Sequence, residues 1–194
     1  MDTIIKSYIE KLKDDRLIMP AWYEKGKIVM LNQLKLPEEE YIELSTAEEI
    51  AQAIKDMVIR GSGAIALAGI YGILMEVFNS KGKLDRLEDV GKLLISTRPT
   101  AVNMHKTVAN LIDGLKGLGA DEALIEVQKL SVDIMEKQLE AERQIGKNGA
   151  KLIGDGEIIM TICHAGGVAG FGFGGRTLSI FRTAVEEGKD ISII

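Results

Sequence analysis

The C-terminal part of this sequence constrains the fold most, because two strand-like runs there enclose a helical segment. GEIIMTI (residues 156–162) and DISII (190–194) have the composition of strands, and RTLSIFRTAVEEGK (176–189) predicts a helix that ends near Gly188. A strand, a helix and a second strand in this order form a βαβ unit, whose strands run parallel. We therefore predict an α/β fold in which residues 151–194 form the first βαβ unit of a parallel-sheet domain.

The sequence TICHAGGVAGFGFGG (161–175) joins the first run to the helix and contains Cys163, the one cysteine of the chain. Cys163 lies at the carboxyl end of the predicted strand, where open α/β sheets bind their ligands. Two interpretations of this thiol remain open: an inert, buried small side chain, or a reactive thiolate favoured by the start of the next helix. The glycines likewise fit either a cradle of backbone N–H groups for a phosphate or a loop packed against a neighbouring domain.

Residues 170–175 match the pattern G-x-G-x-x-G, so a dinucleotide site has to be considered. In the dinucleotide fingerprint the first glycine directly follows the strand, whereas residues 163–169 intervene here. We therefore expect no NAD or FAD and no other cofactor. The two histidines, His105 and His164, together with Cys163 offer too few ligands at the wrong spacing for a structural zinc, so we expect no metal site.

The sequence before residue 151 is dominated by helical periodicity. Apolar residues recur on one face over 4–12 and over 121–145, which predicts a short opening helix and a long amphipathic helix. Residues 22–36 contain two short strand-like segments around a glycine turn and predict a β-hairpin. We therefore expect residues 1–150 to form a mainly helical domain with a small hairpin.

Two further helices are predicted between the hairpin and the long helix. Ser45 and Glu48 have the spacing of a capping box, which predicts a helix that runs to about Ile59. The apolar stretch 63–78 is shorter than the ~18 residues expected of a membrane span. It therefore predicts a buried core helix.

Arg60 and Arg98 are the candidate anion-binding residues. Arg60 lies in the tight junction RGSG (60–63), just ahead of that core helix, and Arg98 precedes Pro99, which we expect in the first turn of another helix. Guanidinium groups and the free N–H groups of a helix start both bind phosphate oxygens, so the two arginines could grip one phosphate from two sides. Either arginine alone is also consistent with an ordinary surface charge.

Charge and cysteine content argue against several classes of function. The chain has a formal net charge of -5, with Lys and Arg interleaved with Asp and Glu, which argues against a nucleic-acid surface. One cysteine cannot form an internal disulfide, and the N-terminal sequence lacks the apolar core of a signal peptide. We therefore expect a cytoplasmic protein that binds neither nucleic acid nor a membrane.

Three separated blocks, 54–73, 93–111 and 159–191, resemble in order and spacing the methylthioribose-1-phosphate isomerases of the methionine salvage pathway. The blocks read IKDMVIRGSGAIALAGIYGI, LLISTRPTAVNMHKTVANL and IMTICHAGGVAGFGFGGRTLSIFRTAVEEGKDI. Relatives of that family are the ribose-1,5-bisphosphate isomerases and the regulatory subunits of translation initiation factor 2B. The resemblance implies a helical N-terminal domain, a Rossmann-like C-terminal domain, substrate bound between them, and a homodimer.

The resemblance also implies an activity and a set of site residues. These isomerases interconvert a 1-phosphorylated aldose and a 1-phosphorylated ketose. Because the anomeric oxygen carries phosphate, the site must assist ring opening and then move hydrogen from C2 to C1. The substrate-binding residues implied are Arg60, Gly61 and Ser62 in the phosphate-binding turn, Arg98 as a second substrate arginine, and Gly166. Cys163 matches the reactive-site cysteine, which relays a proton or stabilises a transition state.

The sequence departs from the family pattern in the phosphate turn and beside the cysteine. Ser62 and Gly63 stand where the family usually has Ala-Pro, and His164 stands where it usually has Asn. Two related substrates, 5-deoxyribose 1-phosphate and ribose 1,5-bisphosphate, therefore remain alternatives, as does a non-catalytic regulatory subunit. The resemblance places the family's catalytic aspartate and a further substrate-binding glutamine beyond residue 194. We therefore expect the rest of the Rossmann-like domain in a second polypeptide or in a longer product.

Overall fold

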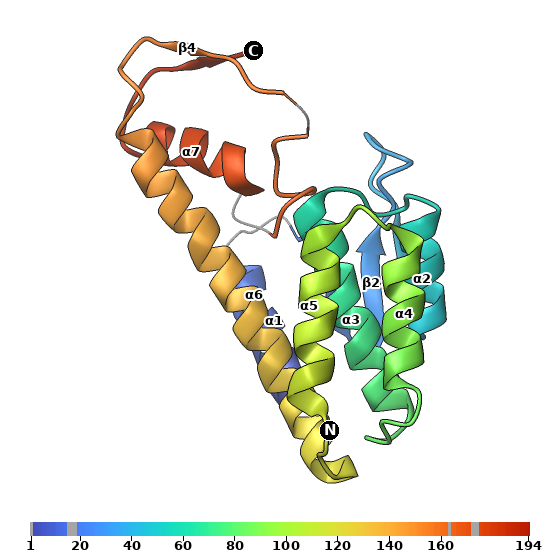
Figure 1. Cartoon of the computed structure of the whole chain (residues 1–194). Coiled ribbons are helices and arrows are strands. Elements are labelled where there is room, and N and C mark those ends of the chain that lie inside the picture. The colour runs from blue at the N-terminus through green and yellow to red at the C-terminus, as the bar shows by residue number, and fades with distance from the viewer. Residues whose placement is uncertain (1, 15–18, 163, 172–174) are drawn as a thin grey trace.

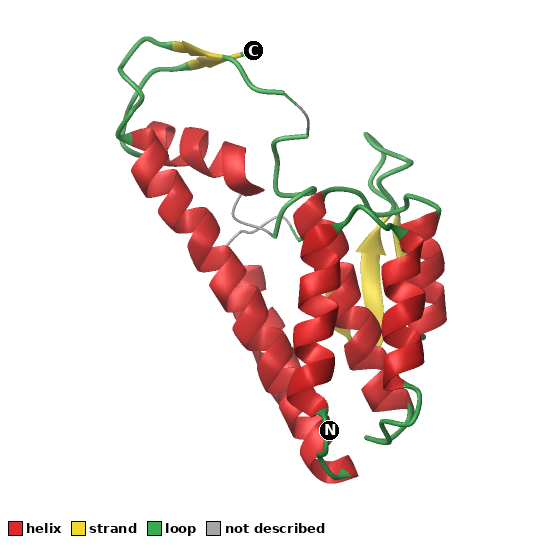
Figure 2. Cartoon of the chain, viewed as in Figure 1, coloured by secondary structure: helices red, strands yellow, loops and turns green. Residues whose placement is uncertain are grey.

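The computed structural model describes residues 2–14, 19–162, 164–171 and 175–194. Helices predominate, and the strands form two small sheets (Figure 2). The helices are α1 (Thr3–Asp14), α2 (Ala47–Lys55), α3 (Ser62–Asn79), α4 (Leu87–Thr97), α5 (Val102–Leu115), α6 (Ala120–Ala150) and α7 (Gly175–Glu186). The strands are β1 (Ala21–Glu24), β2 (Lys27–Leu31), β3 (Tyr41–Leu44), β4 (Ile158–Ile159) and β5 (Ser192–Ile193).

The predicted hairpin is present as β1 and β2. These strands pair antiparallel with Ala21 opposite Met30, and Lys25 and Gly26 form the turn with positive φ angles of 49° and 83°. A third strand, β3, pairs antiparallel with β2 and was not predicted. One face of the sheet is buried, because β1 contacts both α1 and α3.

The helix α3 forms the centre of the core. It contacts α2, α4, α5 and α6, and Figure 1 shows it between and behind α4 and α5. Within the described part of the chain it is the one helix long and apolar enough to cross a membrane, but 78% of that stretch is buried inside the protein. The prediction of a buried core helix over 63–78 is therefore confirmed.

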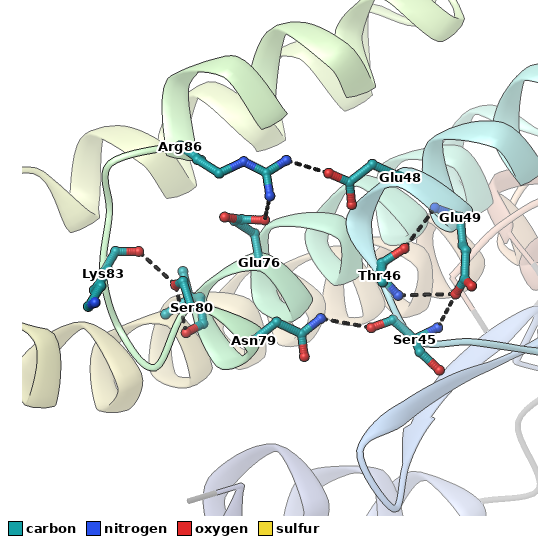
Figure 3. Close-up of polar contacts among 10 residues, drawn as sticks. Ser45, Thr46, Glu48, Glu49, Glu76, Asn79, Ser80, Lys83 and Arg86 are labelled. Carbon is teal, nitrogen blue, oxygen red and sulfur yellow. Dashed lines mark hydrogen bonds and ion pairs between the residues drawn. The ribbon is translucent and has the colours of Figure 1, made fainter.

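The capping box of α2 lies one residue later than predicted. The Thr46 hydroxyl accepts a hydrogen bond from the Glu49 N–H at 3.1 Å, and the Glu49 carboxylate accepts from the Ser45 and Thr46 N–H groups (Figure 3). Glu48 instead forms an ion pair with Arg86 of the loop before α4. The Ser45–Glu48 assignment was therefore wrong by one position.

The helix α2 is also shorter than predicted. It ends at Lys55, and the prediction that it runs to about Ile59 was wrong. The physical reason is the backbone at Met57, whose φ of 62° is left-handed and cannot continue an α-helix. The chain turns there, and the Val58 N–H bonds to the Ala53 carbonyl.

Arg98 follows the end of a helix, whereas the sequence placed it at a helix start. It is the residue directly after α4, and α5 begins only at Val102, so Pro99 is in neither helix. A proline disfavours helical backbone at the residue before it. Arg98 accordingly has an extended φ of -143° with ψ of 83°, which ends α4.

The helix α6 has 31 residues and extends beyond the predicted range 121–145 at both ends. Figure 1 shows α1 and α5 beside its N-terminal half and α7 beside its C-terminal end.

Beyond α6, β4 and β5 pair in parallel with Ile158 opposite Ser192, which confirms the βαβ unit. Each strand has two residues, fewer than the predicted runs. That residues 151–194 form a separate domain stays a prediction.

Candidate functional site

A cavity of about 430 Å³ opens where the start of α3, the glycine-rich loop (residues 164–171), α6 and the start of α7 come together. Figure 1 shows α7 beside the C-terminal end of α6, across from the upper ends of α3 and α5. Four of the predicted site residues line it: Arg60, Gly61, Ser62 and Gly166. Arg98 is not among its lining residues, and Cys163 lies outside the described part of the chain.

The turn before α3 has a backbone shape that requires glycine. Gly61 is the N-cap residue, with a φ of 99° and a ψ of 140°. A Cβ atom on Gly61 would lie 2.5 Å from the Cα and carbonyl oxygen of Ala169 in the glycine-rich loop. The loop is also bonded to this turn, because the Ala64 N–H donates to the Ala169 carbonyl at 3.2 Å. The N–H groups of Ser62 and Gly63 have no acceptor within the helix, since they belong to its first turn.

Gln33, which sequence reasoning did not select, holds two parts of the site. The Arg60 guanidinium donates to the Gln33 carbonyl at 2.7 Å. The Gln33 side-chain amide donates to the Val168 carbonyl at 3.0 Å, and this side chain is buried, with the residue 3% exposed. The loop between β2 and β3 therefore connects Arg60 to the glycine-rich loop.

Glu142 of α6 is a second residue that the sequence analysis missed. It is 1% exposed and lines the cavity. Its carboxylate accepts hydrogen bonds from the N–H groups of Phe171 at 2.8 Å and Gly175 at 3.2 Å. The available signal was its place on the buried face of α6, at helical spacing from Met135, Leu139 and Gly146. A carboxylate in such a row needs polar partners.

The first turn of α7 forms another wall of the cavity through Arg176 and Thr177. The start of α7 is tied to the loop, because the Leu178 N–H donates to the Ala165 carbonyl at 3.0 Å. His164, next to the predicted cysteine, also lines the cavity. Two helix starts, those of α3 and α7, therefore border the same space.

Arg98 lies at the junction of α4 and α5, and Asn103 of the following helix lines the cavity. The Arg98 Nη1 atom is buried and has no hydrogen-bond partner among the described residues. The Arg98 carbonyl lies 3.1 Å from Nε2 of His105. Within the described residues no group of three or more His, Cys, Asp or Glu side chains could hold a metal ion.

This arrangement suits an anionic ligand. Each helix start carries the equivalent of about half a positive charge, and Arg60 and Arg176 each contribute a guanidinium group. The negative charge of the Glu142 carboxylate is partly offset by hydrogen bonds that it accepts, among them those from the N–H groups of Phe171 and Gly175. A phosphate ester, with two negative charges and several acceptor oxygens, matches these donors.

Residues 58–194 match the Initiation factor 2 subunit family. This chain belongs to that family. Two curated relatives are both named methylthioribose-1-phosphate isomerase: one from Thermosipho africanus, 35% identical over 176 residues, and one from Thermotoga maritima, 40% identical over 173 residues. The matches cover 86% and 87% of this chain and 50% of each relative. The chain thus spans about half the length of the curated relatives it matches.

Two solved structures have the same fold. The delta subunit of translation initiation factor 2B from A. fulgidus is 32% identical with a TM-score of 0.77, and the match covers 91% of this chain and 53% of that chain. The 5-methylthioribose 1-phosphate isomerase from Pyrococcus horikoshii is 26% identical with a TM-score of 0.78, covering 92% and 60%. The resemblance drawn from the three sequence blocks is therefore confirmed.

Proposed function

We propose that this chain is part of an aldose–ketose isomerase of methionine salvage that converts 5-methylthioribose 1-phosphate to 5-methylthioribulose 1-phosphate. The observation that carries the proposal is the cavity in which Arg60 and the first turns of α3 and α7 offer donors for a phosphate. The names of the curated relatives support the same substrate class.

The proposed roles follow from the chemistry of the reaction. Arg60, Gly61 and Ser62 bind the C1 phosphate at the start of α3, and Gly166 lets the loop backbone approach the sugar closely. Arg98 does not line the cavity, but its Nη1 atom has no partner among the described residues, and we propose that it supplies a second guanidinium to the substrate from the junction of α4 and α5. Cys163 relays a proton or stabilises the transition state as hydrogen moves from C2 to C1. Because C2 is oxidised as C1 is reduced within one molecule, the reaction consumes no external oxidant or reductant.

Two alternatives remain, each with its own support. A substrate such as 5-deoxyribose 1-phosphate or ribose 1,5-bisphosphate is supported by Ser62, Gly63 and His164, which depart from the usual family residues and line the cavity. A non-catalytic regulatory role is supported by the likeness to the initiation factor 2B delta subunit. Such a protein would bind a sugar phosphate without converting it.

The deciding experiment offers the three sugar phosphates to the protein purified from its native source with any polypeptide that accompanies it. Proton NMR follows the loss of the anomeric proton signal, and carbon NMR follows the new ketone carbon. We expect conversion of 5-methylthioribose 1-phosphate and a large loss of turnover in Arg60→Ala. Binding without conversion of any of the three would instead support the regulatory role.

The exposed apolar side chains around β4 support a proposal about partners. Ile158, Met160 and Ile162 are 70%, 78% and 91% exposed, whereas parallel sheets are normally covered on both faces. We propose that further parallel strands of a second polypeptide or a longer product cover this surface, in a homodimeric assembly. Residues 1–194 alone should then be inactive and self-associate in size-exclusion chromatography with light scattering. A monodisperse, active 194-residue chain would contradict this proposal.

A further inference from the structure

We propose that Glu142 is a positioning residue of this site, which acts by holding the glycine-rich loop and the start of α7. Its carboxylate is bonded to Phe171 on one side of residues 172–174 and to Gly175 on the other. Gly175 is the first residue of α7, so the same carboxylate fixes where the first turn of that helix lies. That turn contributes Arg176 and Thr177 to the cavity wall.

The chemistry of the contact requires a carboxylate. Two of its described partners are backbone N–H donors that bond to different carboxylate oxygens, Phe171 to Oε1 and Gly175 to Oε2. A glutamine has nearly the same shape but offers one acceptor oxygen and one amide that donates. In Glu142→Gln, one of the two N–H groups would therefore face another donor in a buried space, which is costly.

The glycine-rich loop also packs closely against the start of α7 beside the Glu142 carboxylate. A Cβ atom on Gly170 would lie 2.5 Å from the Cα of Gly175 and 3.1 Å from Oε1 of Glu142. Gly170 of the loop and Gly175 of α7 therefore lie in close contact next to the carboxylate. Loss of one hydrogen bond there releases both the loop and the start of α7, and both line the cavity.

If Glu142 positions the donors, replacing it by glutamine should change the affinity for phosphate in the direction opposite to the one expected from charge alone. A carboxylate beside a phosphate site repels the ligand, so removing its charge should strengthen phosphate binding if charge were its main effect. If Glu142 instead positions the donors, Glu142→Gln should weaken binding although the repulsive charge is gone. The matched control is Glu140→Gln, which removes the same charge from an exposed residue of α6 whose one hydrogen bond among the described residues is to Gln144.

The experiment measures two quantities in the purified protein and its variants. Calorimetric titration with 5-methylthioribose 1-phosphate gives the affinity, and hydrogen–deuterium exchange of peptides spanning 165–178 reports the loop. The affinity measurement rests on the proposed function, whereas the exchange measurement does not. We expect Glu142→Gln to lose roughly tenfold or more in affinity, as for a hydrogen bond to a charged group, and to exchange faster only in those peptides. Glu140→Gln should match the wild type, and Glu142→Asp, which keeps both acceptors, should fall between.

Three results would overturn the proposal. One is unchanged or tighter binding by Glu142→Gln with unchanged exchange in 165–178. Another is global unfolding of both Glu142→Gln and Glu142→Asp, which would assign the residue to fold stability. A third is an equal effect of Glu140→Gln. If the wild type neither binds nor converts the sugar phosphate, the proposed function fails, and the exchange comparison alone then decides the role of Glu142.

Discussion

Replacing Gly61 by alanine tests the contact between the phosphate turn and the glycine-rich loop. Alanine in the left-handed helical region costs roughly 1–2 kcal/mol, and Gly61, with a φ of 99° and a ψ of 140°, lies in a region that is still more restricted to glycine. At Gly61 the new Cβ would also lie 2.5 Å from backbone atoms of Ala169, and backbone cannot rotate away as a side chain can. Forcing an extra methyl group into a packed site costs roughly 1–3 kcal/mol more. The loop must therefore move, which lengthens the bond from the Ala64 N–H to the Ala169 carbonyl.

The matched control is Gly117→Ala. Gly117 also has a positive φ, 78°, but a Cβ there would meet nothing within 4 Å. The difference between the two variants reports the clash with Ala169 together with any additional backbone strain at Gly61. For a chain of this size each kcal/mol shifts the Tm by roughly 2–4 °C, so Gly61→Ala should melt roughly 2–12 °C below Gly117→Ala in a calorimetric scan. Equal Tm values for the two variants would refute the close approach of the loop to this turn.

Three other substitutions test the cap and the proposed site residues. Thr46→Ala should lower the free energy of unfolding, measured by urea denaturation, by ~1 kcal/mol, because the Thr46 hydroxyl caps α2. Ser45→Ala should have a smaller effect. A larger effect of Ser45→Ala than of Thr46→Ala would instead support Ser45 as the cap, as the sequence predicted. Arg98→Ala should weaken binding of 5-methylthioribose 1-phosphate in calorimetry with little change in Tm, since its buried Nη1 has no partner among the described residues to lose; unchanged affinity would remove it from the site. Cys163→Ser should keep the Tm and lose most turnover in the NMR assay, and near-normal turnover would favour the inert buried thiol.

Helices and strands with strong periodicity were predictable from the sequence. The stripes over 4–12 and 121–145 determine α1 and most of α6, because contacts between residues three and four apart are local. The continuous apolar run 63–78 predicted that α3 is buried, because a helix that is apolar on all sides has no polar face to expose to water. Element ends were less predictable, as the left-handed Met57 at the end of α2 illustrates.

The turn before α3 was also predictable, in part, although its role in binding phosphate stays a prediction. Arg60, Gly61 and Ser62 are adjacent in sequence, and a junction directly before an apolar helix has free N–H groups wherever it lies in the fold. Arg98 was harder to place, because the same Pro99 can follow a helix end or occupy a first turn. The structure shows that Arg98 has extended backbone before Pro99 and therefore ends one helix rather than beginning another.

The contacts of Glu142 and Gln33 with the glycine-rich loop could be found only in the tertiary structure. Glu142 bonds to N–H groups 29 and 33 residues away, and Gln33 bonds to a carbonyl 135 residues away. No local pattern encodes such pairs, since they depend on how α6, α7 and the β2–β3 loop meet. The amino-acid order therefore determines the helix starts that can bind an anion, through local backbone geometry. The tertiary contacts decide that two of those starts face one cavity.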